Sequence, residues 1–169
     1  FEQGGEAVNW FINAWQKYDP NKMSQGMRME MIKRYPALGE TYTDENGKTV
    51  YTDFGEMLFT HFGVSGPMIL SASAHMRDME KERYEIFIDL KPALSEEKLD
   101  ARILRDFADN NNKSISNVLA LLLPKSLISP VLRMAQIKQS EKINQITKEM
   151  RKNLVDTIKN LKLTVMDFN

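Results

Sequence analysis

The chain has 169 residues, and its 23 Lys and Arg balance its 23 Asp and Glu, so the formal net charge at pH 7 is zero. A balanced charge gives no overall attraction to nucleic acid, an anionic membrane or an acidic partner. Cysteine is absent and only 2 His are present. This composition excludes disulfides and thiolate catalysis, and we expect no metal site.

Two features concern the setting of the chain. It contains no apolar run long enough to cross a bilayer and no signal peptide, so we expect a soluble, cytoplasmic protein that does not bind membranes. It begins with Phe1 instead of an initiator Met. We therefore expect it to be part of a longer polypeptide.

Residues 1–47 are predicted to be a helical N-terminal segment that runs into the start of a hairpin. Apolar residues recur at helical spacing over residues 6–18, and methionines repeat every four residues over 23–31, which predicts two helices ending before Pro36. The dipeptide Asn46-Gly47 is typical of a tight turn between two strands. It predicts a hairpin over residues 40–53.

Residues 48–94 are predicted to form a β-rich part. An apolar run over residues 57–62 indicates a strand, and a glycine-bearing turn then leads into a helix that begins at Pro67 and is capped by Ser65. Strict alternation of apolar and polar residues over 84–90 indicates the clearest strand of the chain.

Residues 95–161 are predicted to form a helical subdomain. Ser95 and Thr147 are candidate N-caps of its first and last helices, and Pro124 opens another helix that Pro130 bends or splits. Residues 162–169 alternate again and return to the β-rich part. Strands, then helices, then a returning strand predict an α+β fold, with a small sheet part and a small helical bundle.

One segment contains more polar and glycine residues than packing requires. Two glycines flank a hydroxyl residue just before a helix start, so backbone N–H groups there can face a phosphate, a carboxylate or the polar edge of a heteroaromatic ring. A plain junction between a strand and a helix needs the same residue types, and an isolated His is often structural. Spacing alone leaves both interpretations open for Thr60, His61, Gly63, Ser65, Gly66 and Pro67.

The C-terminal part of the chain is locally basic. Nine Lys and Arg over residues 125–162 outnumber three acidic residues. Such a surface can contact an RNA backbone, and it can equally be a solvated helix face. The basic residues are Lys125, Arg133, Lys138, Lys142, Lys148, Arg151, Lys152, Lys159 and Lys162.

Several motifs of self-contained enzymes are missing. The sequence has no GxGxxG, no P-loop, no GxSxG and no HExxH, so the chain carries no recognisable cofactor cradle of its own. We expect it to be inactive by itself, as a part of an enzyme or as a binding domain.

Three stretches together resemble a known family. The run over residues 54–67, with Ile88-Asp89-Leu90 and Pro92 after it, closely resembles the insert region of the BaiN-like NAD(P)/FAD-dependent oxidoreductases. The Leu-Leu-Pro-Lys core at residues 122–125 and the closing strand at 161–165 resemble its helical part and its return strand. The resemblance covers residues 48–165, and residues 1–47 lie outside it.

The resemblance implies a split Rossmann flavoprotein interrupted by a β-barrel-like part and a small helical bundle. The chain would be this insert, forming one wall of a substrate pocket, and its main partner would be the FAD-binding domain of the same polypeptide. The parent would be an FAD-dependent oxidoreductase acting on a small-molecule substrate, with NAD(P)H as a candidate second cofactor. Proteins resembling this family have also been connected with ribosomal RNA reduction.

The resemblance also implies site residues. Thr60, His61, Gly63, Ser65, Gly66 and Pro67 would lie toward the flavin ring and the substrate pocket. The N–H groups of the turn or Thr60 would position the substrate or the flavin, and His61 would act in orientation or proton exchange. The alternative function is a helical interaction module that binds RNA or a protein partner through its basic C-terminal helices.

Overall fold

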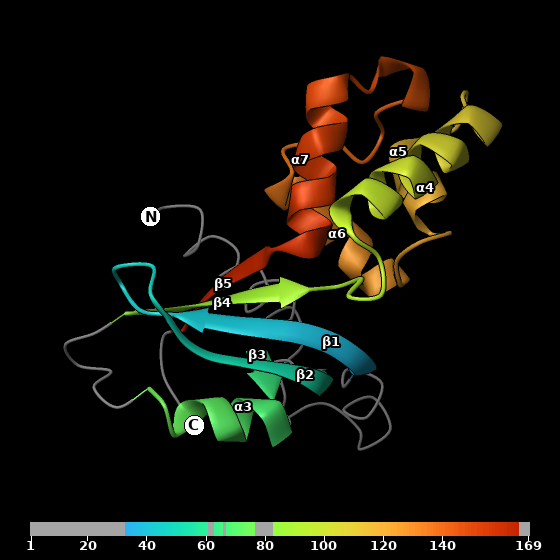
Figure 1. Ribbon diagram of the computed structural model, residues 1–169. Coiled ribbons are helices and arrows are strands. Elements are labelled where there is room, and N and C mark those ends of the chain that lie inside the picture. Colours follow the sequence, from blue (N-terminus) through green and yellow to red (C-terminus); the bar gives the residue numbers. More distant parts are fainter. Residues whose placement is uncertain (1–32, 61–62, 66, 77–82, 166–169) are drawn as a thin grey trace, which may run out of the picture. The chain divides into compact units, whose positions relative to one another are not determined.

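A computed structural model describes residues 33–60, 63–65, 67–76 and 83–165 (Figure 1). The chain divides into two compact units. The sheet unit consists of the described residues of Phe1–Asp89 and Lys162–Asn169, and the helical unit is Leu90–Leu161. The helices predicted over residues 6–18 and 23–31 lie outside the described residues.

A five-stranded sheet with the order β3-β2-β1-β4-β5 forms the centre of the sheet unit. Strand β1 is antiparallel to both β2 and β4, and β3 is antiparallel to β2. The strands are β1 (Lys33–Thr43), β2 (Thr49–Thr60), β3 (Gly63–Ser65), β4 (Tyr84–Asp89) and β5 (Leu161–Val165).

The predicted hairpin is confirmed, because β1 and β2 pair and are joined by a turn that includes Asn46 and Gly47. The Asp44 carboxylate closes this turn by accepting hydrogen bonds from the backbone N–H groups of Asn46 and Lys48, both at 2.9 Å. Gly47 has a φ of 77°, which suits glycine. Strand β1 begins at Lys33, earlier than the predicted hairpin, in a segment whose pattern favours helix.

Helix α3 (Pro67–Ser73) packs against β2 and β3 (Figure 1). It begins at Pro67, as predicted. Gly55 on β2 allows Met68 to approach closely, since a Cβ on Gly55 would lie 3.3 Å from the Met68 sulfur. The buried hydrophobic side chains that the structure describes in the sheet unit are Leu38, Tyr42, Met57, Met68, Ala72, Met76, Tyr84, Ile86, Ile88 and Leu163.

The helical unit contains α4 (Glu96–Asp109), α5 (Ile115–Leu119), α6 (Lys125–Met134), the 3-10 helix η1 (Ile143–Gln145) and α7 (Lys148–Lys159). The two predicted caps are confirmed. The hydroxyl of Ser95 accepts from the Lys98 N–H at 3.3 Å, and that of Thr147 accepts from the Met150 N–H at 3.1 Å. Helix α6 continues through Pro130, so this proline does not split it.

Helix α7 packs against both α4 and α6, and α5 packs against α6. The apolar stripe of α4, consisting of Leu99, Ile103 and Phe107, is buried as its spacing predicts. Leu154 and Ile158 on α7 are also fully buried. One antiparallel-paired sheet and one helical cluster confirm the predicted α+β class.

The C-terminus of α6 contains a strained residue. Gln136 has a φ of 60°, the left-handed region that costs a residue with a Cβ about 1 kcal/mol or more. It follows the helix directly, and the next residue, Ile137, donates its N–H to the Leu132 carbonyl at 2.9 Å. This is the position after a helix that glycine usually occupies.

Gln136→Gly is therefore expected to raise the free energy of unfolding by about 1 kcal/mol. Urea denaturation followed by circular dichroism measures this change. Gln145→Gly is the matched control, because Gln145 is also exposed but lacks a positive φ, and it should lower stability by about 0.5–1 kcal/mol. An equal loss in both variants would contradict the assignment of strain.

Candidate functional site

Four of the six predicted site residues lie in the sheet unit where β2, β3 and α3 follow one another along the chain. Thr60 is the last residue of β2 and pairs with Gly63, while Ser65 pairs with Leu58 and Pro67 begins α3. The other two residues, His61 and Gly66, lie outside the described residues.

The glycine-bearing turn predicted over residues 63–66 is wrong for its first three residues. Gly63–Ser65 form the short strand β3, because the backbone continues pairing with β2 instead of turning directly into the helix. Ser65 is thus the end of a strand. Strand β3 is the outermost strand of the described sheet. An edge strand has backbone N–H and C=O groups that are not hydrogen-bonded to another strand, so these groups can bind a ligand.

A buried carboxyl group lies elsewhere on the sheet, at a position that the sequence did not indicate. Glu40 on β1 is 1% exposed, and its Oε2 accepts a hydrogen bond of 2.6 Å from the Tyr42 hydroxyl. Its Oε1 has no hydrogen-bond partner among the residues that the structure describes. A buried polar atom without a partner is costly, so this group is poised between two protonation states.

A second tyrosine–carboxylate pair lies directly across the hairpin. Asp53 on β2 is the register partner of Glu40, and Tyr51 is the register partner of Tyr42. The Tyr51 hydroxyl donates to Asp53 Oδ2 at 2.8 Å. The Tyr51 ring also stacks on the imidazole of His75, with ring centroids 4.7 Å apart.

The two carboxyl groups have different charges at neutral pH. Burial raises the pKa of Glu40 from 4.5 to about 7; the Tyr42 hydrogen bond opposes this increase and the negative charge of Asp53 adds to it. Hydrogen bonds from Tyr51 and from the Phe54 N–H lower the pKa of Asp53. Asp53 is therefore ionised at neutral pH, while Glu40 holds a proton over part of its population.

One sequence signal points to this cluster in retrospect. Glu40 and Tyr42 are two residues apart in a strand, so they share a face, and the Asn46-Gly47 turn puts Tyr51 and Asp53 opposite them. What remained hidden was the burial of that face, because the sequence does not indicate which elements pack over it.

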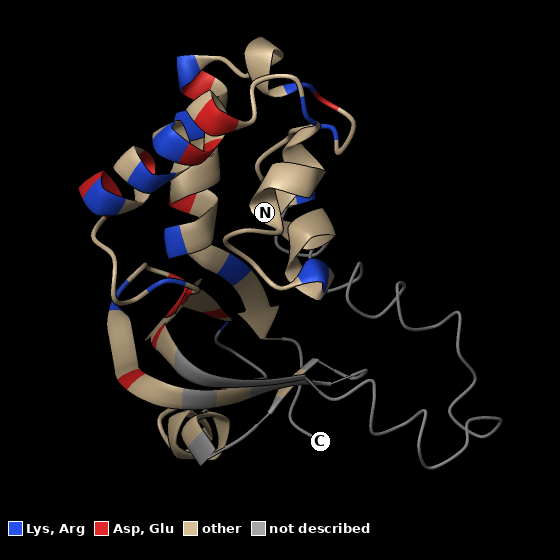
Figure 2. Cartoon of the chain, turned by 90° about the vertical axis from the view of Figure 1, so that its right-hand side faces the viewer, with Lys and Arg blue, Asp and Glu red and all other residues tan. Residues whose placement is uncertain are grey.

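The helical unit carries its charges unevenly (Figure 2). Acidic and basic residues stand side by side on α4 and α7, whereas residues 110–146 contain five basic residues and one acidic residue, Glu141. We call the five basic residues the basic surface: Lys113, Lys125, Arg133, Lys138 and Lys142. All five are exposed, and within the described chain none forms an ion pair with a carboxylate.

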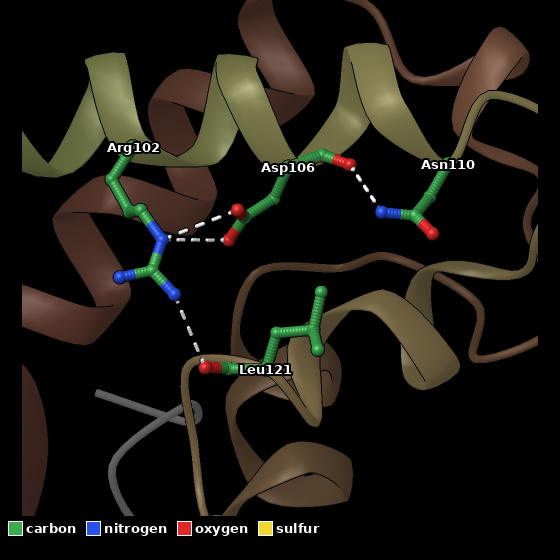
Figure 3. Close-up of polar contacts among 4 residues, drawn as sticks. All are labelled: Arg102, Asp106, Asn110 and Leu121. Carbon is green, nitrogen blue, oxygen red and sulfur yellow. Dashed lines mark hydrogen bonds and ion pairs between the residues drawn. The ribbon is translucent and has the colours of Figure 1, made fainter.

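Two arginines of the helical unit have structural partners. Arg102 Nε contacts Asp106 Oδ2 at 3.0 Å, and its Nη2 donates to the Leu121 carbonyl, which ties α4 to the turn after α5 (Figure 3). Arg151 on α7 contacts Asp100 on α4 at 2.7 Å. These two arginines connect α4 to its neighbours, whereas the cations of the basic surface form no ion pair with a carboxylate within the described chain.

Two kinds of feature, a metal site and a membrane-spanning helix, are absent from the described residues. No group of three or more His, Cys, Asp or Glu in that part of the chain is arranged to hold a metal ion. None of the helices that the structure describes is long and apolar enough to cross a membrane.

Comparison with known proteins identifies relatives of this chain. Residues 22–169 match the family described as the HI0933-like protein barrel and H2TH domain. This match begins well before residue 48, where the sequence resemblance was placed, and so includes strand β1.

Two curated relatives are both named ribosomal RNA dihydrouridine synthase. The one from Haemophilus influenzae is 32% identical over 128 residues, and the one from Escherichia coli is 29% identical over 124 residues. These alignments cover 76% and 72% of this chain but only 29% and 28% of the relatives. The chain thus spans less than a third of the length of either relative.

Glu40→Gln is expected to change how stability depends on pH. Because the folded pKa of about 7 lies above the ordinary 4.5, wild-type stability is full below about pH 4.5, falls as pH rises to about 7, and then levels off. The total loss is about 3 kcal/mol. Glutamine keeps the shape and accepts from Tyr42 but cannot ionise, so the variant should lack this decline and exceed wild type above pH 7.

The measurement is urea denaturation across this pH range. Glu45→Gln, at an exposed position in the turn of the same hairpin, is the matched control and should follow the wild-type profile. A Glu40→Gln profile parallel to wild type would mean that Glu40 does not hold the proton.

Proposed function

We propose that this chain lines the substrate pocket of an FAD-dependent, NAD(P)-linked oxidoreductase. The chain belongs to the HI0933-like barrel and H2TH domain family, which is the insert region of a family of flavoproteins. The observation that carries this proposal is the family match over residues 22–169. The edge formed by β3 and the start of α3 supports it, since this open edge contains the residues that the resemblance assigns to the pocket.

The FAD would be held mainly by another domain of the same polypeptide. The chain has no dinucleotide-binding motif, and its described candidate segment offers a short edge strand instead of a phosphate cradle. In the proposal, Gly63, Ser65, Gly66 and Pro67 approach the flavin ring through their backbone, where small side chains leave room. FAD, when bound, supplies the hydride chemistry.

Thr60 and His61 are the proposed catalytic residues of this edge. Thr60 ends β2 directly beside Gly63, and its hydroxyl would position the substrate. His61 follows it, and an imidazole changes charge near neutral pH, so it would orient the substrate or exchange a proton with it. The chain by itself would be inactive, because it supplies one wall of the pocket without the cofactor domain.

Ribosomal RNA is the proposed substrate class. The support is the name shared by the two relatives, which are called ribosomal RNA dihydrouridine synthases. The exposed, unpaired cations of the basic surface favour a polyanionic substrate over a neutral small molecule. A small-molecule substrate is the alternative outcome of the experiments below.

The first test compares the visible absorption spectrum of the purified full-length parent with that of this chain alone. A flavin spectrum is expected in the parent and not in the chain, because the cofactor domain lies outside these residues. A correctly folded parent without flavin would refute the oxidoreductase assignment.

The second test separates the two half-reactions of the parent. His61→Ala should slow oxidation of the reduced flavin by ribosomal RNA about a hundredfold, the usual contribution of a proton-transferring group, and leave flavin reduction by NADPH unchanged. Stopped-flow absorbance measures both steps. His75→Ala is the control, because His75 is an exposed imidazole of the same unit, and it should change neither step.

A further inference from the structure

The five cations of the basic surface lie on a patch formed by segments that contact one another. The backbone of residues 113–115 pairs with that of residues 141–143: Ile143 N–H donates to the Lys113 carbonyl at 3.0 Å, and Ser114 and Lys142 form a β-bridge. This pairing brings the chain at Lys113 next to the chain at Lys142, although the two residues are far apart in the sequence.

Helix α6 joins the same patch through its middle turn. The Gln139 side-chain amide donates to the Ser129 hydroxyl at 2.8 Å, which places the stretch containing Lys138 against α6. Lys125 and Arg133 lie one helical turn before and after Ser129, on the same side of the helix. They are separated by about 12 Å along the axis, so the cations line an extended surface.

This patch differs from the surface that the sequence alone suggests. The nine basic residues counted over residues 125–162 include Arg151, Lys159 and Lys162, and these have structural roles. Lys159 donates to the carbonyls of Lys91 and Leu94, and Lys162 contacts Glu85 at 2.8 Å. Lys148 and Lys152 on α7 are exposed as well. The other four of the nine, Lys125, Arg133, Lys138 and Lys142, lie on α6 and in the 138–142 stretch, and Lys113 joins them from outside the counted range.

We propose that the basic surface binds the phosphate backbone of folded, double-helical RNA, an assignment that rests on the proposed function. Lys and Arg side chains contact phosphates without reading sequence, and such contacts position a protein on a nucleic acid. The helical unit has one aromatic residue, Phe107, and it is buried. Without an exposed aromatic ring the unit offers no aromatic platform for unpaired bases, which favours contacts to the backbone and shape of a double helix.

The same composition disfavours a protein partner. Protein interfaces are enriched in aromatic residues and Met and depleted in Lys, whereas four of the five residues of the basic surface are Lys. An acidic protein would meet this patch only through rim-like charge pairs, which are screened by salt and contribute little. RNA instead releases its condensed counterions at each phosphate contact, which gives such a surface its affinity.

The test uses the full-length parent with two charge-matched triple variants. Lys125→Gln/Arg133→Gln/Lys142→Gln removes three cations of the basic surface, and Lys98→Gln/Arg105→Gln/Lys152→Gln removes three exposed cations from α4 and α7. Fluorescence anisotropy with a labelled RNA hairpin measures Kd over a salt series. Circular dichroism checks the fold of both variants.

The basic-surface variant should bind the hairpin at least about tenfold more weakly at low salt, and the slope of log K against log salt should fall by about 2–3. The control variant should stay within about twofold of wild type. Equal weakening in both variants, or none in the first, would overturn the assignment. So would tighter binding of polyglutamate than of the hairpin to the wild-type protein, since that result indicates an acidic protein partner.

The flavin spectrum and NADPH reduction are measured on the same samples. A wild-type parent that lacks flavin, or that does not reduce RNA, would refute the proposed function, whereas the comparison of the two triple variants would still show whether the basic surface binds RNA. An intact flavoenzyme whose RNA binding is insensitive to Lys125, Arg133 and Lys142 would refute the basic surface alone.

Discussion

The pairing of β1 on both of its edges is the constraint on which the sheet unit depends. Strand β2 pairs with one edge of β1 and β4 pairs with the other, so β1 is an interior strand. Its backbone groups are hydrogen-bonded to one strand that precedes α3 in the chain and to one that follows it. The face of β1 that carries Glu40 and Tyr42 is buried. Burial of this face raises the pKa of Glu40.

The same sheet order makes β3 an edge. Two features therefore lie on opposite sides of β2: a buried carboxyl group with a raised pKa on β1, and the three-residue edge strand β3. In the proposed pocket, this edge would provide the access that a substrate or a cofactor domain needs.

The helical unit shows a similar separation of roles. Helix α7 packs against both α4 and α6, Arg151 on α7 forms an ion pair with Asp100 on α4, and Lys159 donates to the carbonyls of Lys91 and Leu94 before α4. The basic side chains of residues 110–146 form no ion pairs within the described chain. Surface residues without such contacts can take part in binding without loss of stability.

The sequence by itself determined the elements whose signals are local: the hairpin at Asn46-Gly47, the alternating strand β4, and the caps at Ser95 and Thr147. Each rests on contacts between residues a few positions apart, which a pattern records. Tertiary structure alone decided that Gly63–Ser65 form an edge strand, that Glu40 is buried, and that the segment at Lys113 pairs with the segment at Lys142 while Arg151 pairs with Asp100. These features depend on which distant segments come into contact. Burial and ion pairing are set by those contacts, and the spacing of residues along the chain does not reveal them.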